Sequence, residues 1–235
     1  MWRGHTVSVI LPTYNERDSI RDCIERFLAT GCVDEVIVVN NNGAPGTSEE
    51  VARTRAREVM EPAQGYGRAI RRGLSEATGE WLVICEPDGT FRPEDLFKLF
   101  AYAEDFDYVI GTRTTRELVW QGANMGFMLK WGNWFVAKMA EFLFDSTILT
   151  DVGCTFRLLK RGVLERISPG FTRTGSDFGL EMTLLVMRNR ISFVEIPVNY
   201  MARVGVSSVT GSRRKTFALA LAMMRLILRY RLGGR

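Results

Sequence analysis

Two acidic residues, Glu86 and Asp88, directly follow a hydrophobic segment, residues 81–85, that has the composition of a buried strand. A buried strand that delivers carboxylates at its carboxyl end places hard oxygen ligands where a divalent cation and a phosphate can meet. The spacing therefore indicates a site for a metal ion and a nucleotide. The alternative interpretation is that the two acids begin a solvated turn, because such turns are common after strands.

The length and composition of the chain bound what surrounds these acids. Its 235 residues, 46% of them hydrophobic, are enough to bury a full core. We expect one domain over residues 1–210 and a basic tail over residues 211–235. The four cysteines are scattered and His5 is the single histidine, which excludes a zinc ribbon and a histidine-based triad and favours a reducing compartment. The amino terminus lacks the build of a signal peptide, so we expect a cytoplasmic protein.

The positive charge of the chain is concentrated in its tail. The net charge is +4, and the last two dozen residues contain Arg213, Arg214, Lys215, Arg225, Arg229, Arg231 and Arg235. A basic segment favours an anionic partner. Residues 217–228 form an apolar run without an aromatic ladder for stacking on bases, which favours an anionic membrane surface over nucleic acid. We predict an amphipathic helix over residues 213–232, too short to span a bilayer, that associates peripherally with the inner face of the cell membrane.

Hydrophobic runs and helical periodicity alternate along most of the chain. Strands are predicted over residues 7–11, 35–39, 81–85, 108–110, 156–159 and 193–198, and helices over residues 19–29, 48–57, 67–77, 93–103 and 177–187. This alternation predicts an α/β fold, with a mostly parallel sheet that is flanked by helices and binds ligands at the carboxyl ends of its strands. The aromatic, Met-rich segment 118–144 is interpreted either as ordinary core or as a membrane-interface belt.

Five motifs occur in an order that resembles the inverting family 2 glycosyltransferases of GT-A (Rossmann-like) fold. They are VSVILPTYNE (7–16), GYGRAIRRGLSEATGEWLVICEPD (65–88), GTR (111–113), TDVGCTFRLLKR (150–161) and VEIPVNYMARVGVSS (194–208). The last two are most similar to the dolichyl- and polyprenyl-phosphate sugar transferases. The resemblance implies metal-dependent transfer of mannose or glucose from a GDP- or UDP-sugar to polyprenyl phosphate, with Mg²⁺ or Mn²⁺ as the cofactor.

The sequence departs from this family's pattern at three places. Segment 86–88 reads Glu-Pro-Asp where the family usually has Asp-x-Asp, with Thr90 in the place of a Gln. Residues 40–42 are asparagines where the family has an Asp after the second strand. Residues 126–127 stand where an arginine usually precedes the acceptor-binding helix, and Lys130 is a candidate substitute. These departures leave the donor base and the acceptor open.

For the donor, the resemblance implies roles at the edge of the sheet. Asp88 is predicted to bind the metal directly and to be catalytic, and Glu86 to reach either the metal through water or the ribose hydroxyls. A purely structural role for Asp88, capping its own turn, is the alternative. Pro12 would shape the turn after the first strand, while Tyr14 and Glu16 would contact the base and the ribose, unless they form an N-cap cluster for the next helix.

Two further residues are candidates for contact with the nucleotide. Asn41 would face the base edge, where an amide can recognise uracil or guanine alike. Arg68 could add positive charge near the diphosphate at the start of a helix that follows two glycines. A tight turn explains those glycines equally well.

For the acceptor, the resemblance implies that Arg113, Arg203, Ser207 and the substitute Lys130 hold a phosphate, with Arg203 counted among the catalytic residues. A phosphate monoester is already an anion near pH 7, so it requires cations that position it and no general base. Arginine suits this task through its fixed fork of donors. The alternative for Arg203 is a surface arginine that follows a strand.

Two other functions stay open. A hydroxyl acceptor would require a general base, for which Asp177 and Glu181 are candidates. Glu181 also matches an acid of the lipid-phosphate branch and is a predicted catalytic residue in both cases. The third hypothesis is a non-catalytic module that binds a nucleotide sugar, which the departures at residues 86–88 and 40–42 would suit.

Overall fold

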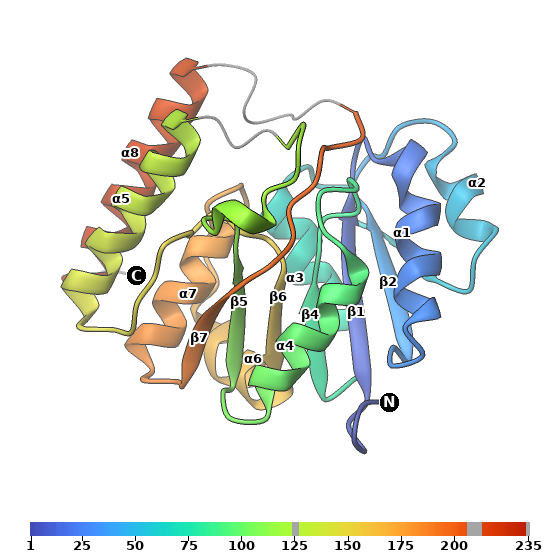
Figure 1. Cartoon of the computed structure of the whole chain (residues 1–235), viewed down its shortest axis with the longest axis horizontal. Helices are drawn as coiled ribbons and strands as arrows, with labels where there is room; N and C mark the ends of the chain where they lie inside the picture. The colour runs from blue at the N-terminus through green and yellow to red at the C-terminus, as the bar shows by residue number, and fades with distance from the viewer. Residues whose placement is uncertain (124–126, 206–212, 234–235) are drawn as a thin grey trace.

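A mixed seven-stranded sheet forms the centre of the computed structural model, with the strands in the order β3-β2-β1-β4-β6-β5-β7 (Figure 1). The structure describes residues 1–123, 127–205 and 213–233, and for residues 127–130 and 213–217 it describes the backbone alone. β6 runs antiparallel to β4 and β5, and the other neighbouring pairs are parallel. The strands are β1 (Val7–Thr13), β2 (Glu35–Asn40), β3 (Arg57–Met60), β4 (Trp81–Ile84), β5 (Tyr108–Thr112), β6 (Arg157–Lys160) and β7 (Phe193–Pro197).

Helices cover both faces of this sheet, as the sequence predicts. They are α1 (Arg17–Ala29), α2 (Thr47–Ala52), α3 (Tyr66–Glu76), α4 (Leu96–Ala103), α5 (Phe127–Phe144), α6 (Arg161–Ile167), α7 (Phe178–Arg188) and α8 (Arg213–Arg231). Three short 3₁₀ turns, η1 (Pro93–Asp95), η2 (Arg116–Leu118) and η3 (Ser168–Gly170), lie in the connections.

Alternating side chains of the central strands supply two hydrophobic cores. Val9 and Leu11 of β1 pack in a cluster with α1 and α4, whereas Ile10 packs in the cluster that includes α3, α5, α7 and α8. Successive residues of a strand point to opposite faces, so one strand serves both cores. The result is three layers, helices on either side of a sheet, and the predicted α/β fold is confirmed.

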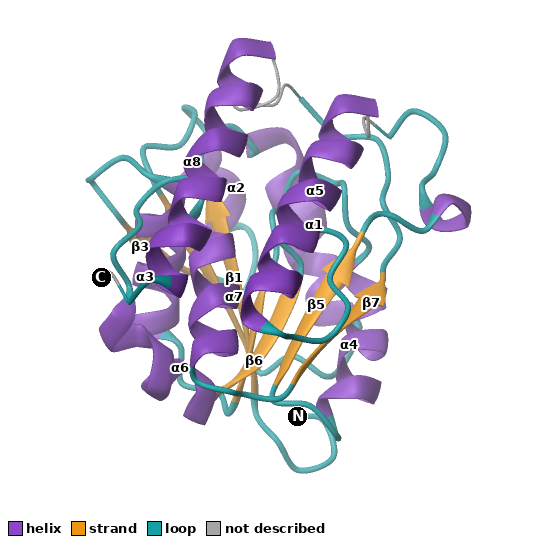
Figure 2. Cartoon of the chain, turned by 90° about the vertical axis from the view of Figure 1, so that its left-hand side faces the viewer, coloured by secondary structure: helices purple, strands orange, loops and turns teal. Residues whose placement is uncertain are grey.

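α8 lies alongside α5 on one side of the molecule (Figure 2). Met223, Leu226, Ile227 and Tyr230 of α8 are buried in the same cluster as the central strands. The helix predicted over residues 213–232 is therefore present, and its apolar face is packed on the body of the protein. Among the described residues, no helix has the length and apolar content to cross a bilayer. The division into a domain 1–210 and a tail 211–235 stays a prediction.

Three elements differ from the prediction. The helix predicted over residues 48–57 ends at Ala52, and residues 57–60 form β3 at the edge of the sheet. Only Val59 of this four-residue strand is buried, so its sequence carries too little apolar pattern to be recognised. The helix predicted over residues 93–103 begins as a 3₁₀ turn, and α6 was not predicted at all.

Candidate active site

Asp88 lies in a tight turn directly after β4. Its side chain is buried, and its Oδ1 accepts hydrogen bonds from the Thr90 backbone N–H at 2.9 Å and the Thr90 hydroxyl at 2.5 Å. Gly89 in this turn has φ +79°, and a Cβ there would lie 3.0 Å from Cγ2 of Val204. The turn thus packs closely against the segment after β7. One Asp88 oxygen has the structural role of the alternative interpretation, which leaves the other oxygen for a ligand.

Arg203, in the segment after β7, faces both acids. Its Nη2 lies 2.6 Å from Oδ2 of Asp88 and donates a hydrogen bond of 3.2 Å to Oε2 of Glu86. The contact with Asp88 lacks hydrogen-bond geometry, so this buried Oδ2 accepts no hydrogen bond from the residues that the structure describes. Attraction between opposite charges therefore holds the guanidinium there. The Arg203 side chain is 25% exposed, so it is not the freely solvated surface arginine of the alternative interpretation.

The two carboxylates influence each other strongly. Burial, followed by repulsion from Asp88, raises the pKa of Glu86 to about 7, although the positive charge of Arg203 acts in the opposite direction. A site with this property favours additional positive charge. The carboxyl group of Glu86 and the Oδ2 of Asp88 are hard oxygen donors that fit Mg²⁺ or Mn²⁺. Within the described ranges no group of three or more metal-binding side chains occurs.

A small cavity lies between α3 and the start of α7. Its volume is about 20 Å³, enough for one water molecule, and Tyr66, Thr155, Arg157 and Ser176 are among its lining residues. The hydroxyls of Tyr66 and Thr155 are buried and make no hydrogen bond with the described part of the chain. Burial, followed by the charge of Glu86, raises the pKa of Tyr66, so this hydroxyl stays protonated beside the acid.

On the donor side, Glu16 organises the turn after β1. Its Oε2 accepts hydrogen bonds from the backbone N–H groups of Tyr14 at 2.6 Å and Asn15 at 2.9 Å. Glu16 occupies the N-cap position of α1 but makes no side-chain bond to that helix, so it caps the preceding turn instead. Pro12 is buried in β1 opposite Val39, and the Tyr14 side chain is exposed at the edge of the sheet.

Asn41 uses its amide within the protein. Its Nδ2 donates to the carbonyl groups of Glu61 at 2.7 Å and Ala63 at 3.0 Å, and its Oδ1 accepts from the backbone N–H of Gly65 at 2.8 Å. The predicted contact of Asn41 with the base edge does not match this arrangement, because its donors and acceptor already hold the loop before α3. An asparagine after a strand serves loop structure as readily as ligand recognition.

The start of α3 is pressed against the loop before α7. Gly65 has φ +154°, and a Cβ there would lie 2.5 Å from the carbonyl oxygen of Thr174. The Gly67 backbone N–H donates to the same oxygen at 2.9 Å. Close approach of two backbones thus explains both glycines. Arg68 on the first turn of α3 is exposed and forms no ion pair or side-chain hydrogen bond with the described residues, so it is available to an anion at this edge.

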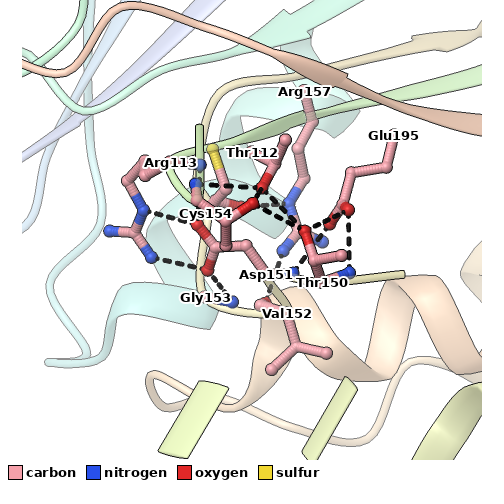
Figure 3. Close-up of polar contacts among 10 residues, drawn as sticks. Thr112, Arg113, Thr150, Asp151, Val152, Gly153, Cys154, Arg157 and Glu195 are labelled. Carbon is pink, nitrogen blue, oxygen red and sulfur yellow. Dashed lines mark hydrogen bonds and ion pairs between the residues drawn. The ribbon is translucent and has the colours of Figure 1, made fainter. Parts of the chain in front are cut away.

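Arg113, at the end of β5, is bound by Asp151 (Figure 3). Its Nε donates to Oδ2 of Asp151 at 2.8 Å and its Nη2 donates to Oδ1 at 2.9 Å. Asp151 also accepts from the backbone N–H groups of Arg113 and Gly153 at 3.1 Å each. Although burial alone would raise it, the guanidinium and these N–H groups hold the pKa of Asp151 below its usual value.

A second carboxylate, Glu195 of β7, binds the Thr150–Asp151 segment (Figure 3). Its Oε1 accepts from the Asp151 backbone N–H at 2.8 Å, and its Oε2 accepts from the N–H and the hydroxyl of Thr150 at 2.7 and 2.6 Å. Burial raises the pKa of Glu195 in spite of these donors. Arg113 is therefore held by a network that extends across two strands. Asp151 lies in the motif at residues 150–161, and its role as the partner of Arg113 is not apparent from the sequence.

Tyr200 contacts Arg113 and pairs with the segment after β5. The guanidinium carbon of Arg113 lies 5.2 Å from the centroid of the Tyr200 ring, a cation–π contact. The Tyr200 N–H donates to the Leu118 carbonyl at 2.9 Å, and the Trp120 N–H donates to the Tyr200 carbonyl at 2.8 Å. The segments after β5 and β7 thus run side by side next to the acids. Sequence reasoning missed Tyr200, although it lies in the quoted motif three residues before Arg203.

The two candidate bases at the start of α7 are both engaged. Glu181 is fully buried and accepts from the hydroxyls of Thr172 at 2.6 Å and Tyr230 at 2.7 Å, besides two backbone N–H groups. Asp177 accepts from Nε of Arg173 at 2.7 Å. These contacts favour a structural role for Glu181, and its catalytic role stays a prediction. Ser207 and the side chain of Lys130 lie outside the described residues.

Sequence comparisons identify related proteins. The family model described as glycosyl transferase family 2 matches residues 8–168. An uncharacterized glycosyltransferase of Mycobacterium tuberculosis is 29% identical over 228 residues, which span 95% of this chain and 99% of that protein. The low-salt glycan biosynthesis hexosyltransferase Agl6 of Haloferax volcanii is 26% identical over 211 residues, 87% of this chain and 50% of that protein.

Solved structures show a similar architecture. Glucosyl-3-phosphoglycerate synthase of Mycobacterium tuberculosis, crystallised with Mn²⁺, UDP-glucose and glycerol 3-phosphate, superimposes with a TM-score of 0.75 at 16% identity, over 99% of this chain and 82% of that one. The same enzyme with Mg²⁺ and UDP gives a TM-score of 0.72 at 18% identity, over 99% and 81% of the two chains. At such identities the likeness is one of fold, and it confirms the predicted GT-A architecture.

Proposed function

Because the chain belongs to glycosyl transferase family 2, we propose that it transfers mannose or glucose, with inversion, from a GDP- or UDP-sugar to polyprenyl phosphate. One observation carries the proposal: two carboxylates after β4 face one arginine, and Oδ2 of Asp88 is buried without a directed hydrogen bond from the described residues. Glu86 and Asp88 would hold Mg²⁺ or Mn²⁺. When bound, the metal would neutralise charge on the departing diphosphate.

The residues of the donor side would divide the nucleotide among them. Tyr14 is exposed at the edge of the sheet and offers its ring to the base, while Glu16 holds the turn that positions it. Arg68 would approach the diphosphate, because it is exposed and without a described ionic partner. Asn41 would act indirectly, through its hydrogen bonds to the loop that leads into α3.

The state of the candidate bases favours a phosphate acceptor. Glu181 is fully buried with Tyr230 bound to it, and Asp177 is paired with Arg173. A hydroxyl nucleophile would need one of these carboxylates to accept its proton, whereas a phosphate attacks as an anion. Arg203 is partly exposed beside the acids, where it could position that anion through its guanidinium fork.

The face made by α5 and α8 supports docking on an anionic membrane. Four aromatic side chains of α5 that recur at helical spacing are exposed: Trp131, Trp134, Phe135 and Phe142. The adjacent α8 exposes three arginines: Arg225, Arg229 and Arg231. Exposed aromatic residues beside basic ones are typical of helices that lie in the headgroup region, with each cation contributing about 1 kcal/mol near an anionic surface. Such docking would bring the enzyme to its acceptor.

A transfer assay tests the proposal directly. The protein is incubated with Mn²⁺, one of several GDP- and UDP-hexoses, and farnesyl phosphate as a soluble isoprenyl phosphate, and products are identified by mass spectrometry. We expect one hexose on the farnesyl phosphate, and no product when EDTA replaces Mn²⁺. Farnesol, which lacks the phosphate, is the matched control and should remain unmodified.

Two other results would replace the proposal. Transfer to farnesol, or to 3-phosphoglycerate in preference to farnesyl phosphate, would identify a hydroxyl acceptor. Binding of a nucleotide sugar without transfer to any acceptor would identify a binding module. Flotation with vesicles that contain anionic lipid, compared with neutral vesicles, tests the membrane surface separately.

A further inference from the structure

A single nitrogen of Arg203 contacts both acids of the candidate metal site. Nη2 lies 2.6 Å from Oδ2 of Asp88 and 3.2 Å from Oε2 of Glu86. A Mg²⁺ ion binds a carboxylate oxygen at about 2.0–2.1 Å. The guanidinium in its present position fills space next to Oδ2, and its positive charge would repel a metal ion bound to that oxygen. The arginine and the metal are therefore alternative cations for these acids.

The backbone on either side of Arg203 is fixed, so the side chain is the part that can move. The Val204 N–H donates to the Asp88 carbonyl at 2.8 Å, and the Met201 N–H donates to the Thr90 carbonyl at 2.8 Å. These two bonds hold the segment on the acid turn. The side chain of Arg203 is partly exposed, so a rotation can carry its guanidinium from the acids towards solvent without unfolding the segment.

The other arginine near the acids cannot take over this role. Arg113 adds a weaker positive influence at Glu86, but two of its guanidinium nitrogens are bound to Asp151. Asp88 is buried, and Glu86 shares the same Arg203 nitrogen with it, so two neighbouring carboxylates would repel each other without a cation between them. Arg203 supplies that cation in this structure.

We propose that Arg203 is a switch that links donor binding to acceptor binding. It neutralises Glu86 and Asp88 until a divalent cation with its nucleoside diphosphate occupies them, and the released guanidinium then binds the phosphate of the acceptor. This inference rests on the proposed function. It adds the residue that couples the two binding events. Because coupling between two binding sites is reciprocal, each ligand raises the affinity for the other.

Calorimetry with UDP or GDP in place of the sugar nucleotide tests the switch without turnover. Affinity for farnesyl phosphate is measured with and without Mn²⁺ and UDP or GDP, and affinity for the Mn²⁺–nucleotide is measured alone. We expect wild type to bind farnesyl phosphate about 5–150-fold more tightly once the nucleotide and Mn²⁺ are present. Arg203→Gln should bind the Mn²⁺–nucleotide about tenfold more tightly than wild type, and its coupling factor should fall to about one.

Arg116→Gln is the matched control. Arg116 is exposed on η2 and its side chain makes no ion pair or hydrogen bond with the described residues, so its loss changes the net charge equally. This variant should keep the wild-type coupling. A thermal melt of each variant verifies folding, and Arg203→Lys, which retains the charge, should keep part of the coupling.

The outcomes separate the switch from the function on which it rests. Weaker Mn²⁺–nucleotide binding by Arg203→Gln would show that Arg203 holds the diphosphate itself and would overturn the switch. Unchanged affinities and coupling in Arg203→Gln would overturn it as well, while leaving the glycosyltransferase proposal intact. If wild type bound neither nucleotide with Mn²⁺, the proposed function would fail and the switch with it.

Discussion

Two of the arginine–carboxylate clusters among the described residues, Arg113 with Asp151 and Arg203 with Glu86 and Asp88, have similar chemistry and opposite character. In one, Arg113 and Asp151 form two parallel hydrogen bonds of 2.8 and 2.9 Å, and Asp151 receives two backbone N–H groups as well. In the other, Arg203 reaches Asp88 at 2.6 Å without hydrogen-bond geometry. The Arg113 side chain is 10% exposed and that of Arg203 is 25% exposed.

The difference in hydrogen bonding indicates which cluster supports the structure and which one binds a ligand. A buried ion pair contributes to a unique structure when all its lone pairs and protons have partners, as those of Asp151 do. A buried carboxylate oxygen with a cation nearby and no directed hydrogen bond is under-satisfied, as Oδ2 of Asp88 is, and such groups mark places where a ligand completes the coordination. Residue type and charge alone do not make this distinction.

The Arg113–Asp151 cluster is called the closed cluster here, because the carboxylate of Asp151 has all its partners within the protein. Breaking it should have the largest effect on stability. Asp151→Asn would leave the buried guanidinium of Arg113 without a counter-charge, and we expect a loss of about 3–5 kcal/mol, or roughly 6–20 °C in Tm. Thermal and urea unfolding measure this loss. Asp145→Asn is the control, since Asp145 is exposed and its side chain makes no hydrogen bond or ion pair with the described residues. Equal stabilities of the two variants would contradict a closed cluster.

The same variant has a defined pH dependence. The pKa of Asp151 is held below its usual value of 3.8, so its ionised form contributes stability above pH 3.8, and this contribution is lost as the pH falls through the lower folded-state pKa. The gap in unfolding free energy between wild type and Asp151→Asn should therefore be full at pH 5–7 and should narrow below pH 3.8. Urea titrations across this range measure it. A gap that widened in acid would show that the charge of Asp151 is not the stabilising feature.

The cluster of Arg203, Glu86 and Asp88 is called the open cluster. Breaking it should reduce activity and leave stability nearly unchanged. Asp88→Asn removes the charge of the predicted metal ligand, and we expect kcat/KM to fall about 10²–10³-fold, as when one preorganised electrostatic group is lost. Its Tm should change by less than about 3 °C, because Arg203 keeps Glu86 as a partner and one source of repulsion disappears. Full activity with unchanged Mn²⁺ dependence would contradict the assignment of Asp88 as a metal ligand.

The sequence predicts the position of the open cluster better than the identity of its partners. Hydrophobic strands followed by acids indicate the edge of the sheet, since the signal lies within ten residues. The contact of Arg203 with Glu86 joins positions 117 residues apart, and only the fold decides it. The structure shows the contact of Arg203 with the acids, which the sequence does not predict, and its contact with a phosphate stays a prediction.

Polar residues that support loops are the other limit of sequence reasoning. Asn41 and Glu181 have the residue types of ligand-binding groups and lie near the carboxyl edge of the sheet. Their partners are backbone N–H and C=O groups and the hydroxyls of Thr172 and Tyr230, contacts that depend on loop conformation and on where α8 packs. Local pattern does not determine these features. The short strand β3 escaped recognition for a related reason, because an edge strand with one buried side chain has almost no periodic signal.

The smallest expected effect concerns Glu181. Its carboxylate accepts hydrogen bonds from several donors, as that of Asp151 does, so it resembles the closed cluster in character. Burial, followed by the bond to Glu181, raises the pKa of Tyr230 to about 12, so the Tyr230 hydroxyl remains a donor at neutral pH. Tyr230→Phe removes one donor and leaves those of Thr172 and Arg173. We expect a loss of about 1.5 kcal/mol, near 3–6 °C in Tm, with kcat within about twofold of wild type.

The pH profile of kcat tests whether the role of Glu181 is structural or catalytic. If Glu181 were a general base, losing a hydrogen bond to its charged form would disfavour that form and shift the acidic limb of the profile to higher pH. A purely structural Glu181 leaves the limb where it is in wild type. Tyr102→Phe is the control for loss of a tyrosine hydroxyl, since Tyr102 is 45% exposed and its hydroxyl makes no hydrogen bond with the described residues. A shift in Tyr230→Phe that Tyr102→Phe does not show would move Glu181 from the scaffold into the chemistry.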